Sequence, residues 1–82
     1  MRVFVTQQHI DAGTPGSCNT DPIALAMKDA GCLVPWVSPS HLAWNDRFHA
    51  TYSVDTPGEV LAFMQAYDNG RATKPFEFEL RS

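Results

Sequence analysis

The sequence predicts a single small α+β domain spanning residues 1–82, and three observations lead to that fold class. Short runs in which apolar and polar residues alternate occur near both ends of the chain and in its middle, as in half-buried strands. Two segments with helical spacing of apolar residues lie between these runs, each with residues typical of a helix start. Hydrophobic residues make up 44% of the 82 positions, which is enough for one small core.

The first strand is predicted around Val3 and Val5, which alternate with Phe4 and polar neighbours, and it ends near Gln7. Residues 8–20 are rich in Gly, Pro, Ser and Asn, so we expect a long loop with at most one helical turn at residues 8–12. Residues 21–31 are the first predicted helix. Its start is a capping aspartate followed by a proline, and its end is a glycine.

The middle of the chain is predicted to contain two strands and the start of a second helix. Residues 32–37 form one strand, and Pro35 places it at a sheet edge or at a bulge because proline cannot donate a ladder hydrogen bond. Residues 47–54 alternate well and form the next strand, while residues 36–48 are expected to include a loop. Thr56 and Glu59 have the spacing of a capping box, which predicts a helix from there to about Gly70.

The last strand is predicted at residues 76–80, where three apolar residues alternate with two glutamates. The resulting order is βαββαβ. That order is used by ferredoxin-like folds, a four-stranded antiparallel sheet with two helices on one face. A plainer α+β sandwich with another strand order stays open, because the first loop is long for a βα connection and Pro35 interrupts the second strand.

Charge and hydrophobicity exclude several classes of function. The formal net charge is −3, with nine Asp and Glu against six Lys and Arg, so we expect no direct binding to nucleic acid. No segment approaches the roughly 18 consecutive apolar residues of a membrane span, and the first residues lack the apolar region of a signal peptide. We therefore expect a cytoplasmic protein in which Cys18 and Cys32 are thiols.

We expect no catalytic site. A thiol nucleophile needs a neighbouring imidazole, and nothing in the spacing of Cys18 or Cys32 brings either to His9, His41 or His49. Cys18 is the more reactive candidate, since it precedes a helix whose positive end would lower the thiol pKa. The chain is therefore expected not to be an enzyme.

Metal and cofactor sites are not expected either. Cys18, Asp21 and His9 are close in sequence, but a zinc site would lack a fourth ligand and the usual paired spacing. The glycines of residues 12–17 have neither the lysine nor the pattern of a phosphate-binding loop. Glu77 and Glu79 share a strand face, and acidic residues on a solvated face explain them better than a carboxylate pair of a glycosidase.

Binding to another protein is the predicted activity. Residues 36–48 combine aromatic and apolar side chains with Asn45, Asp46 and Arg47, which is the composition of interface hot spots. The alternative is that the two tryptophans close the core beneath a long loop. The partner-binding residues that we predict are two aromatic anchors and four carboxylates: Trp36, Trp44, Glu59, Asp68, Glu77 and Glu79.

Four segments together resemble a family of short proteins from tailed phages and their bacterial hosts. They are residues 5–13 (VTQQHIDAG), 22–26 (PIALA), 63–70 (FMQAYDNG) and 75–80 (PFEFEL), and they cover both ends of the chain and both predicted helices. Members of that family often carry a cysteine before the proline of the first helix, close to the position of Cys18. Here that residue is Asp21, which argues further against a metal or redox role.

The resemblance implies a source and, through it, a class of function. A small acidic domain from a phage or another mobile element is similar to anti-CRISPR proteins. Such proteins cover a nucleic-acid-binding surface or an assembly face of a host CRISPR effector complex. The expected partner is then a host protein or nucleoprotein complex, and the expected state a monomer or weak homodimer. The alternative is a structural or regulatory phage module that associates with itself through the edge strand at Pro35 or through the C-terminal strand.

Overall fold

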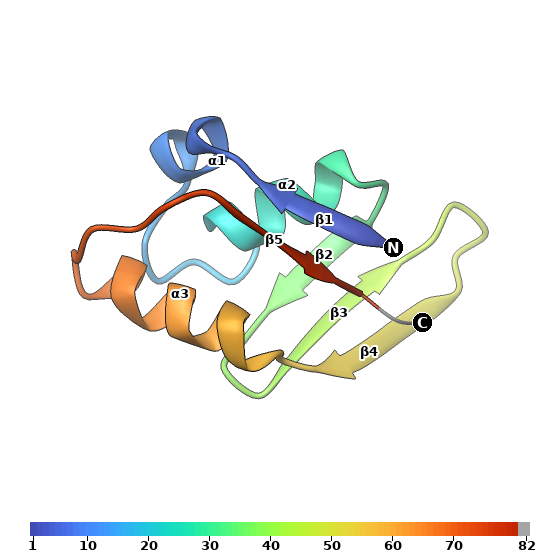
Figure 1. Ribbon diagram of the computed structural model, residues 1–82. Coiled ribbons are helices and arrows are strands. Elements are labelled where there is room, and N and C mark those ends of the chain that lie inside the picture. The colour runs from blue at the N-terminus through green and yellow to red at the C-terminus, as the bar shows by residue number, and fades with distance from the viewer. Residues whose placement is uncertain (81–82) are drawn as a thin grey trace.

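Two antiparallel sheets, rather than one, carry the fold of the computed structural model, which describes residues 1–80 (Figure 1). One sheet pairs β1 with β5, and the other has the order β2-β3-β4. The elements in chain order are β1 (Arg2–Val5), α1 (Gln7–Ala12), α2 (Pro22–Asp29), β2 (Leu33–Val37), β3 (His41–Asn45), β4 (Thr51–Asp55), α3 (Gly58–Asp68) and β5 (Phe76–Glu79). The predicted α+β class is confirmed, whereas the predicted four-stranded sheet is wrong.

The strand β3 explains the difference from the predicted topology. We expected a loop in this region, yet Leu42 and Trp44 alternate with exposed or half-buried neighbours and face the core. β3 pairs with β2 on one side and with β4 on the other, so residues 33–55 form a meander that is complete in itself. Within residues 1–80, the terminal strands then pair only with each other, and a ferredoxin-like sheet does not form.

One hydrophobic core lies between the two sheets. The inward faces of β1 and β5 contribute Val3, Val5 and Phe78, and the three-stranded sheet contributes Leu42 and Trp44 from its central strand. The ribbon formed by β1 and β5 crosses this sheet, with α2 along one side of the ribbon and α3 along the other (Figure 1). Both helices add buried residues to the same core: Ile23, Ala24, Ala26, Met27, Val60, Phe63 and Met64.

The helix starts follow the sequence signals in one case and depart from them in another. Asp21 caps α2 as predicted, with its Oδ1 accepting the Ala24 N–H at 2.7 Å. The predicted capping box at Thr56 is absent, since α3 begins after Pro57 without a side-chain cap. The Thr56 hydroxyl instead donates to the Ser38 carbonyl at 2.7 Å, and so it ties the end of β4 to the turn between β2 and β3.

A capping box does form at the start of α1. Thr6 Oγ1 accepts the His9 N–H at 3.4 Å, and His9 Nδ1 accepts the Thr6 N–H at 3.0 Å. Histidine here takes the place that Glu or Gln usually occupies. The helical turn that we expected at residues 8–12 is therefore a capped helix of 6 residues.

The strand β2 has the edge position and the irregularity that Pro35 predicted. β3 is its partner in the sheet, and the register shifts between Leu33 and Trp36. Val34 lies within this bulge with a φ of 48°, a left-handed conformation that is unfavourable for a β-branched residue. Beyond the bulge, the Val37 N–H donates to the Cys18 carbonyl at 2.8 Å, so the long loop covers part of the edge.

No helix within residues 1–80 is both long enough and apolar enough to cross a membrane.

Gly13 allows the long loop to pass directly over the start of α2. A Cβ atom added at this position would lie 2.6 Å from Pro22 Cδ, although the φ of −72° suits any residue. Tyr67 fixes the same turn from α3, because its hydroxyl lies 3.0 Å from the Ile10 carbonyl and 2.8 Å from the Gly13 carbonyl. Close packing rather than backbone conformation therefore requires glycine here.

We expect Gly13→Ala to lower the free energy of unfolding by about 1–3 kcal/mol, because the new methyl group overpacks the contact with the Pro22 ring. Urea titration followed by circular dichroism measures the change. Gly58→Ala is the matched control: a Cβ there meets nothing within 4 Å. Because Gly58 is helical, alanine should leave stability unchanged or raise it by up to about 1 kcal/mol. Equal stabilities of the two variants would contradict this account of Gly13.

Candidate functional site

The six predicted partner-binding residues are dispersed over the molecule, and the structure brings Trp36 and Asp68 together. Trp36 is half-exposed on the edge strand β2, and Asp68 is the last residue of α3. Both line a pocket of about 240 Å³ between the long loop, β2 and α3. Glu59 is exposed in the first turn of α3, about 14 Å from Asp68 by helix geometry.

Trp44 belongs to the core. It is 3% exposed, and its ring stacks on Tyr52 with the centroids 5.6 Å apart. The strand register explains why one tryptophan is exposed and the other buried. Trp36 is opposite Ala43, so both share one face of the sheet. Trp44 follows Ala43 along β3 and therefore faces the other side. The interpretation in which Trp44 closes the core fits this position, and Trp36 is the tryptophan that a partner can contact.

The pocket beside Trp36 combines apolar walls with two carboxylates. Its lining includes Trp36, Met64, Asp21 and Asp68, together with residues of the long loop such as Cys18. Asp68 Oδ1 accepts the Gly16 N–H at 2.9 Å, which holds that loop against the end of α3. Apolar and acidic residues from the long loop, β2 and α3 therefore line one small cavity.

Asp21 is the most perturbed acid of the pocket. Its side chain caps α2, and the residue is 5% exposed. Burial raises the pKa of the Asp21 carboxyl to about 6; the hydrogen bond from the Ala24 N–H lowers it, and the charge of Asp68 raises it further. Sequence reasoning identified Asp21 as a cap but missed its place in a pocket, because Asp68 and Trp36 reach it only through the tertiary fold.

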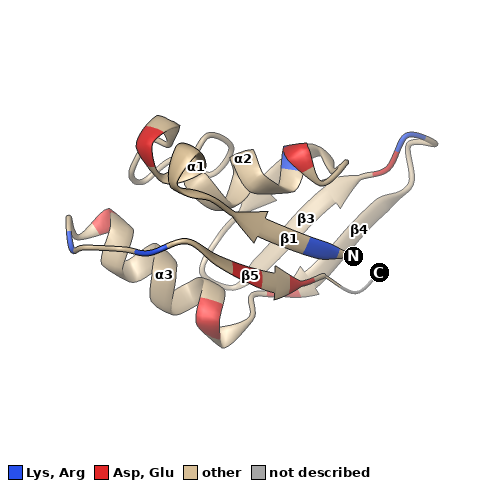
Figure 2. Cartoon of the chain, turned by 45° about the horizontal axis from the view of Figure 1, so that its top comes forward, with Lys and Arg blue, Asp and Glu red and all other residues tan. Residues whose placement is uncertain are grey.

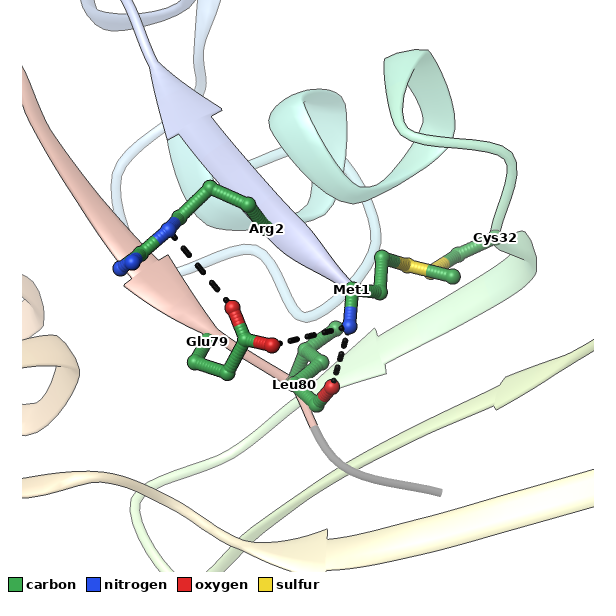
Figure 3. Close-up of polar contacts among 5 residues, drawn as sticks. All are labelled: Met1, Arg2, Cys32, Glu79 and Leu80. Carbon is green, nitrogen blue, oxygen red and sulfur yellow. Dashed lines mark hydrogen bonds and ion pairs between the residues drawn. The ribbon is translucent and has the colours of Figure 1, made fainter.

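The remaining predicted carboxylates lie on the outer face of the ribbon. Glu79 accepts a hydrogen bond from the Met1 amino group at 3.2 Å and lies 3.6 Å from Arg2 Nε (Figure 3). Its charge is thus balanced within the chain. Glu77 lies opposite Phe4, which is 58% exposed and borders an open apolar groove of about 460 Å³. Figure 2 shows the acidic positions of β5 beside α3.

A cluster that sequence reasoning missed links a hydroxyl, an imidazole and a carboxylate. His9 is buried, and its Nε2 lies 2.5 Å from Asp29 Oδ2, while Nδ1 lies 3.1 Å from Thr6 Oγ1. A nucleophile, a base and an orienting acid have this connectivity. Here, however, Nδ1 already accepts the Thr6 backbone N–H of the capping box, so Nε2 carries the ring proton and donates it to Asp29. The cluster fastens α1 to α2.

The groups that we considered for other chemistry do not converge. Cys32 is buried, and burial raises the pKa of its thiol to about 11, far from a reactive thiolate. Cys18 is half-buried in the pocket beside Trp36. Within residues 1–80, no three His, Cys, Asp or Glu side chains are placed to hold a metal ion together.

Comparison of the chain with known protein families, with characterised proteins and with solved structures finds no match.

We expect Asp21→Asn to stabilise the protein at neutral pH. Asparagine caps a helix as well as aspartate does, and it has no charge to bury. Folding raises the Asp21 pKa from its ordinary value of 3.8 to about 6, so the native protein binds this proton more tightly than the unfolded chain. The free energy of unfolding of the parent protein must then fall as the pH rises from 4 to 6. The Asp21→Asn variant lacks the titrating group and should not show this fall.

Urea unfolding at pH 7 should show the Asp21→Asn variant to be more stable by about 1–3 kcal/mol. At pH 4 or below, where Asp21 is protonated in the native state and increasingly so in the unfolded chain, the difference should shrink toward zero. Asp55→Asn, which removes an exposed carboxylate, should show no comparable dependence on pH. A variant that is less stable than the parent at pH 7 would show that the Asp21 charge contributes to folding.

Proposed function

We propose that this chain binds a host protein and acts as an anti-CRISPR-type inhibitor, covering a nucleic-acid-binding or assembly surface of a CRISPR effector complex. The observation that carries the binding role is an apolar patch on the edge strand β2, next to the acidic pocket. We call this patch the β2 edge surface and define it by Leu33, Val34 and Trp36. These side chains are 45%, 77% and 50% exposed.

The β2 edge surface has the features of an interface centre. Three neighbouring large apolar residues are exposed on one short strand, although the same chain buries comparable side chains in its core. Tryptophan is among the residues that contribute most to binding energy in protein interfaces. Val34 presents its side chain from a strained backbone conformation, a feature found more often at functional sites than elsewhere.

The charge around this surface favours a basic partner. Asp21 and Asp68 line the adjoining pocket, and the whole chain carries a net charge of −3. Proteins that hold DNA or RNA present Lys and Arg to the phosphates. An acidic domain that docks on such a surface competes with the nucleic acid and is steered toward it by electrostatic attraction. This complementarity and the resemblance to phage proteins together support a CRISPR effector as the partner.

The first experiment is capture of host proteins by the tagged chain from a lysate of a bacterium that carries CRISPR systems, with mass spectrometry of what is retained. We expect effector subunits in stoichiometric amount. Trp36→Ala should reduce their retention about tenfold or more, as truncation of a hot-spot residue does. Phe48→Ala is the matched control, because Phe48 is 75% exposed but lies in the hairpin between β3 and β4.

Two results would contradict the proposal. Absence of effector subunits from the retained material would overturn the assignment of the partner. Retention that survives Trp36→Ala but is lost in Phe48→Ala would move the binding surface away from β2.

Self-association is a second candidate, and the free edge of β4 favours it. The Ser40 carbonyl accepts the Thr56 N–H, and the Ala50 carbonyl accepts the Asp46 N–H. Along an antiparallel strand, every second residue bonds to the neighbouring strand. The N–H and C=O groups of Thr51, Ser53 and Asp55 are therefore directed away from β3. Such an edge can pair with a second copy. Light scattering over a range of protein concentrations would then give a mass that rises to twice that of the monomer.

A further inference from the structure

We infer that β4 pairs antiparallel with β4 of a second copy of this chain, about a two-fold axis at Ser53. The inference rests on the second candidate function, self-association, and deepens it by naming the register and the residues that meet. It does not depend on a CRISPR partner, because the β2 edge surface lies at the opposite edge of the sheet.

The two edges of the three-stranded sheet differ in what their backbones offer to another strand. On β2, Pro35 has no N–H group, and the Val37 N–H already donates to the Cys18 carbonyl. The register of β2 also shifts within the strand. On β4, all five residues pair with β3 in one continuous register. The regular edge of this sheet is therefore β4.

The outward backbone groups of β4 have no partner among residues 1–80. Those of Thr51, Ser53 and Asp55 are directed away from β3, and no loop or side chain of the described residues bonds to them. β4 contains no lysine, proline or bulge, which are features that keep edge strands from pairing. It also lies at the margin of the molecule (Figure 1). Such an edge is a template for another strand.

The sequence of β4 is complementary to itself about Ser53. With Ser53 on the axis, Thr51 faces Asp55 of the second copy, so all the outward groups of both strands are paired. Tyr52 is then opposite Val54, a favourable aromatic and β-branched pair, and both are half-buried in the single chain. A shift of register in either direction leaves outward groups unpaired. The shift that moves the axis to Asp55 also sets the two carboxylates opposite each other.

Charges beyond the ends of β4 favour the same arrangement. An antiparallel copy brings the hairpin between β3 and β4 next to the start of α3 of the other copy. Arg47 in that hairpin and Glu59 in the first turn of α3 are both exposed and have opposite charges. Within residues 1–80, neither belongs to an ion pair. The axis therefore places a cation near an anion at each end of the joined strands.

The first test measures mass against concentration by light scattering. The parent chain should change from 9.1 kDa toward twice that mass. We expect a dissociation constant between about 10 µM and about 1 mM, as for a small interface. Ser53→Pro removes the N–H on the axis, and an edge strand accepts proline where its N–H points outward. It should weaken the dimer about tenfold or more.

Two further variants at the same position keep the backbone intact. Ser53→Lys sets two like charges opposite each other and should also weaken the dimer about tenfold or more. Ser53→Ala is the matched control and should leave the dimer unchanged. Because Ser53 is exposed in the single chain, both variants should fold as the parent does, which circular dichroism checks.

Disulfide cross-linking tests the register. In Ser53→Cys, the two new thiols lie on the axis with Cα atoms about 5.5 Å apart, a distance that a disulfide spans. In Thr51→Cys, the matched control, they are about 14 Å apart along the strands. Mild oxidation should give a covalent dimer of Ser53→Cys. Thr51→Cys and the parent chain, which has Cys18 and Cys32, should stay uncoupled.

The outcomes separate the inference from the functions proposed above. A parent chain that stays monomeric overturns both self-association and the inference, and it leaves the edge of β4 to an extended segment of another protein. A dimer that persists in Ser53→Pro and Ser53→Lys overturns the inference alone, as does equal cross-linking of Thr51→Cys and Ser53→Cys. Capture of effector subunits tests the proposed host partner independently of all these results.

Discussion

The pairing of the first and last strands is the contact on which the rest of the structure depends. Val3 is paired with Phe78 and Val5 with Phe76, so the two ends of the chain form one ribbon. The inner face of this ribbon closes the core above the three-stranded sheet, and both helices pack alongside it (Figure 1). Because the pairing joins distant parts of the chain, closing it has a large entropic cost, which the burial of large apolar side chains offsets.

This closure also determines which surfaces stay exposed. The ribbon and the helices cover one face of the sheet β2-β3-β4, and the residues on its other face, including Trp36 and Ser53, remain exposed. The outer face of the ribbon is open as well, but Glu79 there is paired with the Met1 amino group and Arg2. The carboxylates beside Trp36 have no such ion pairs among residues 1–80. The exposed apolar side chains of Leu33, Val34 and Trp36 are what favour β2 as the proposed interface.

Local signals in the sequence were sufficient for most elements and insufficient for their assembly. Alternation predicted the terminal strands, and the aspartate and proline at residues 21 and 22 predicted the start of α2. β3 was missed because its inward residues, Leu42 and Trp44, follow a serine- and proline-rich turn and resemble an apolar loop. Without β3, the remaining strands fit a four-stranded sheet that the chain does not form. Sheet order depends on such long-range pairings, which periodicity within one strand does not encode.

The candidate site shows the same division between local and tertiary information. Composition identified an interface-like segment but could not distinguish its two tryptophans, since the bulge in β2 and the register with β3 decide which face each occupies. The sequence pattern did not predict the capping box of α1 either. The third helical position of that box is His9, whereas Glu or Gln usually occupies it. Spacing alone revealed neither the link from His9 to Asp29 nor the approach of Asp68 to Asp21, both of which cross between helices.

Two locally unfavourable features flank the exposed tryptophan. Val34 adopts a left-handed conformation two residues before Trp36, and Asp21 buries a carboxylate in the pocket beside it. Sequences agree with their folds at most positions, and departures from that agreement concentrate where function imposes its own requirements. Val34 has a structural cost in its backbone conformation, and Asp21, although it caps α2, has one in the charge that it buries. Both features lie near the half-exposed Trp36, which agrees with the proposal that this part of the surface is adapted to a partner.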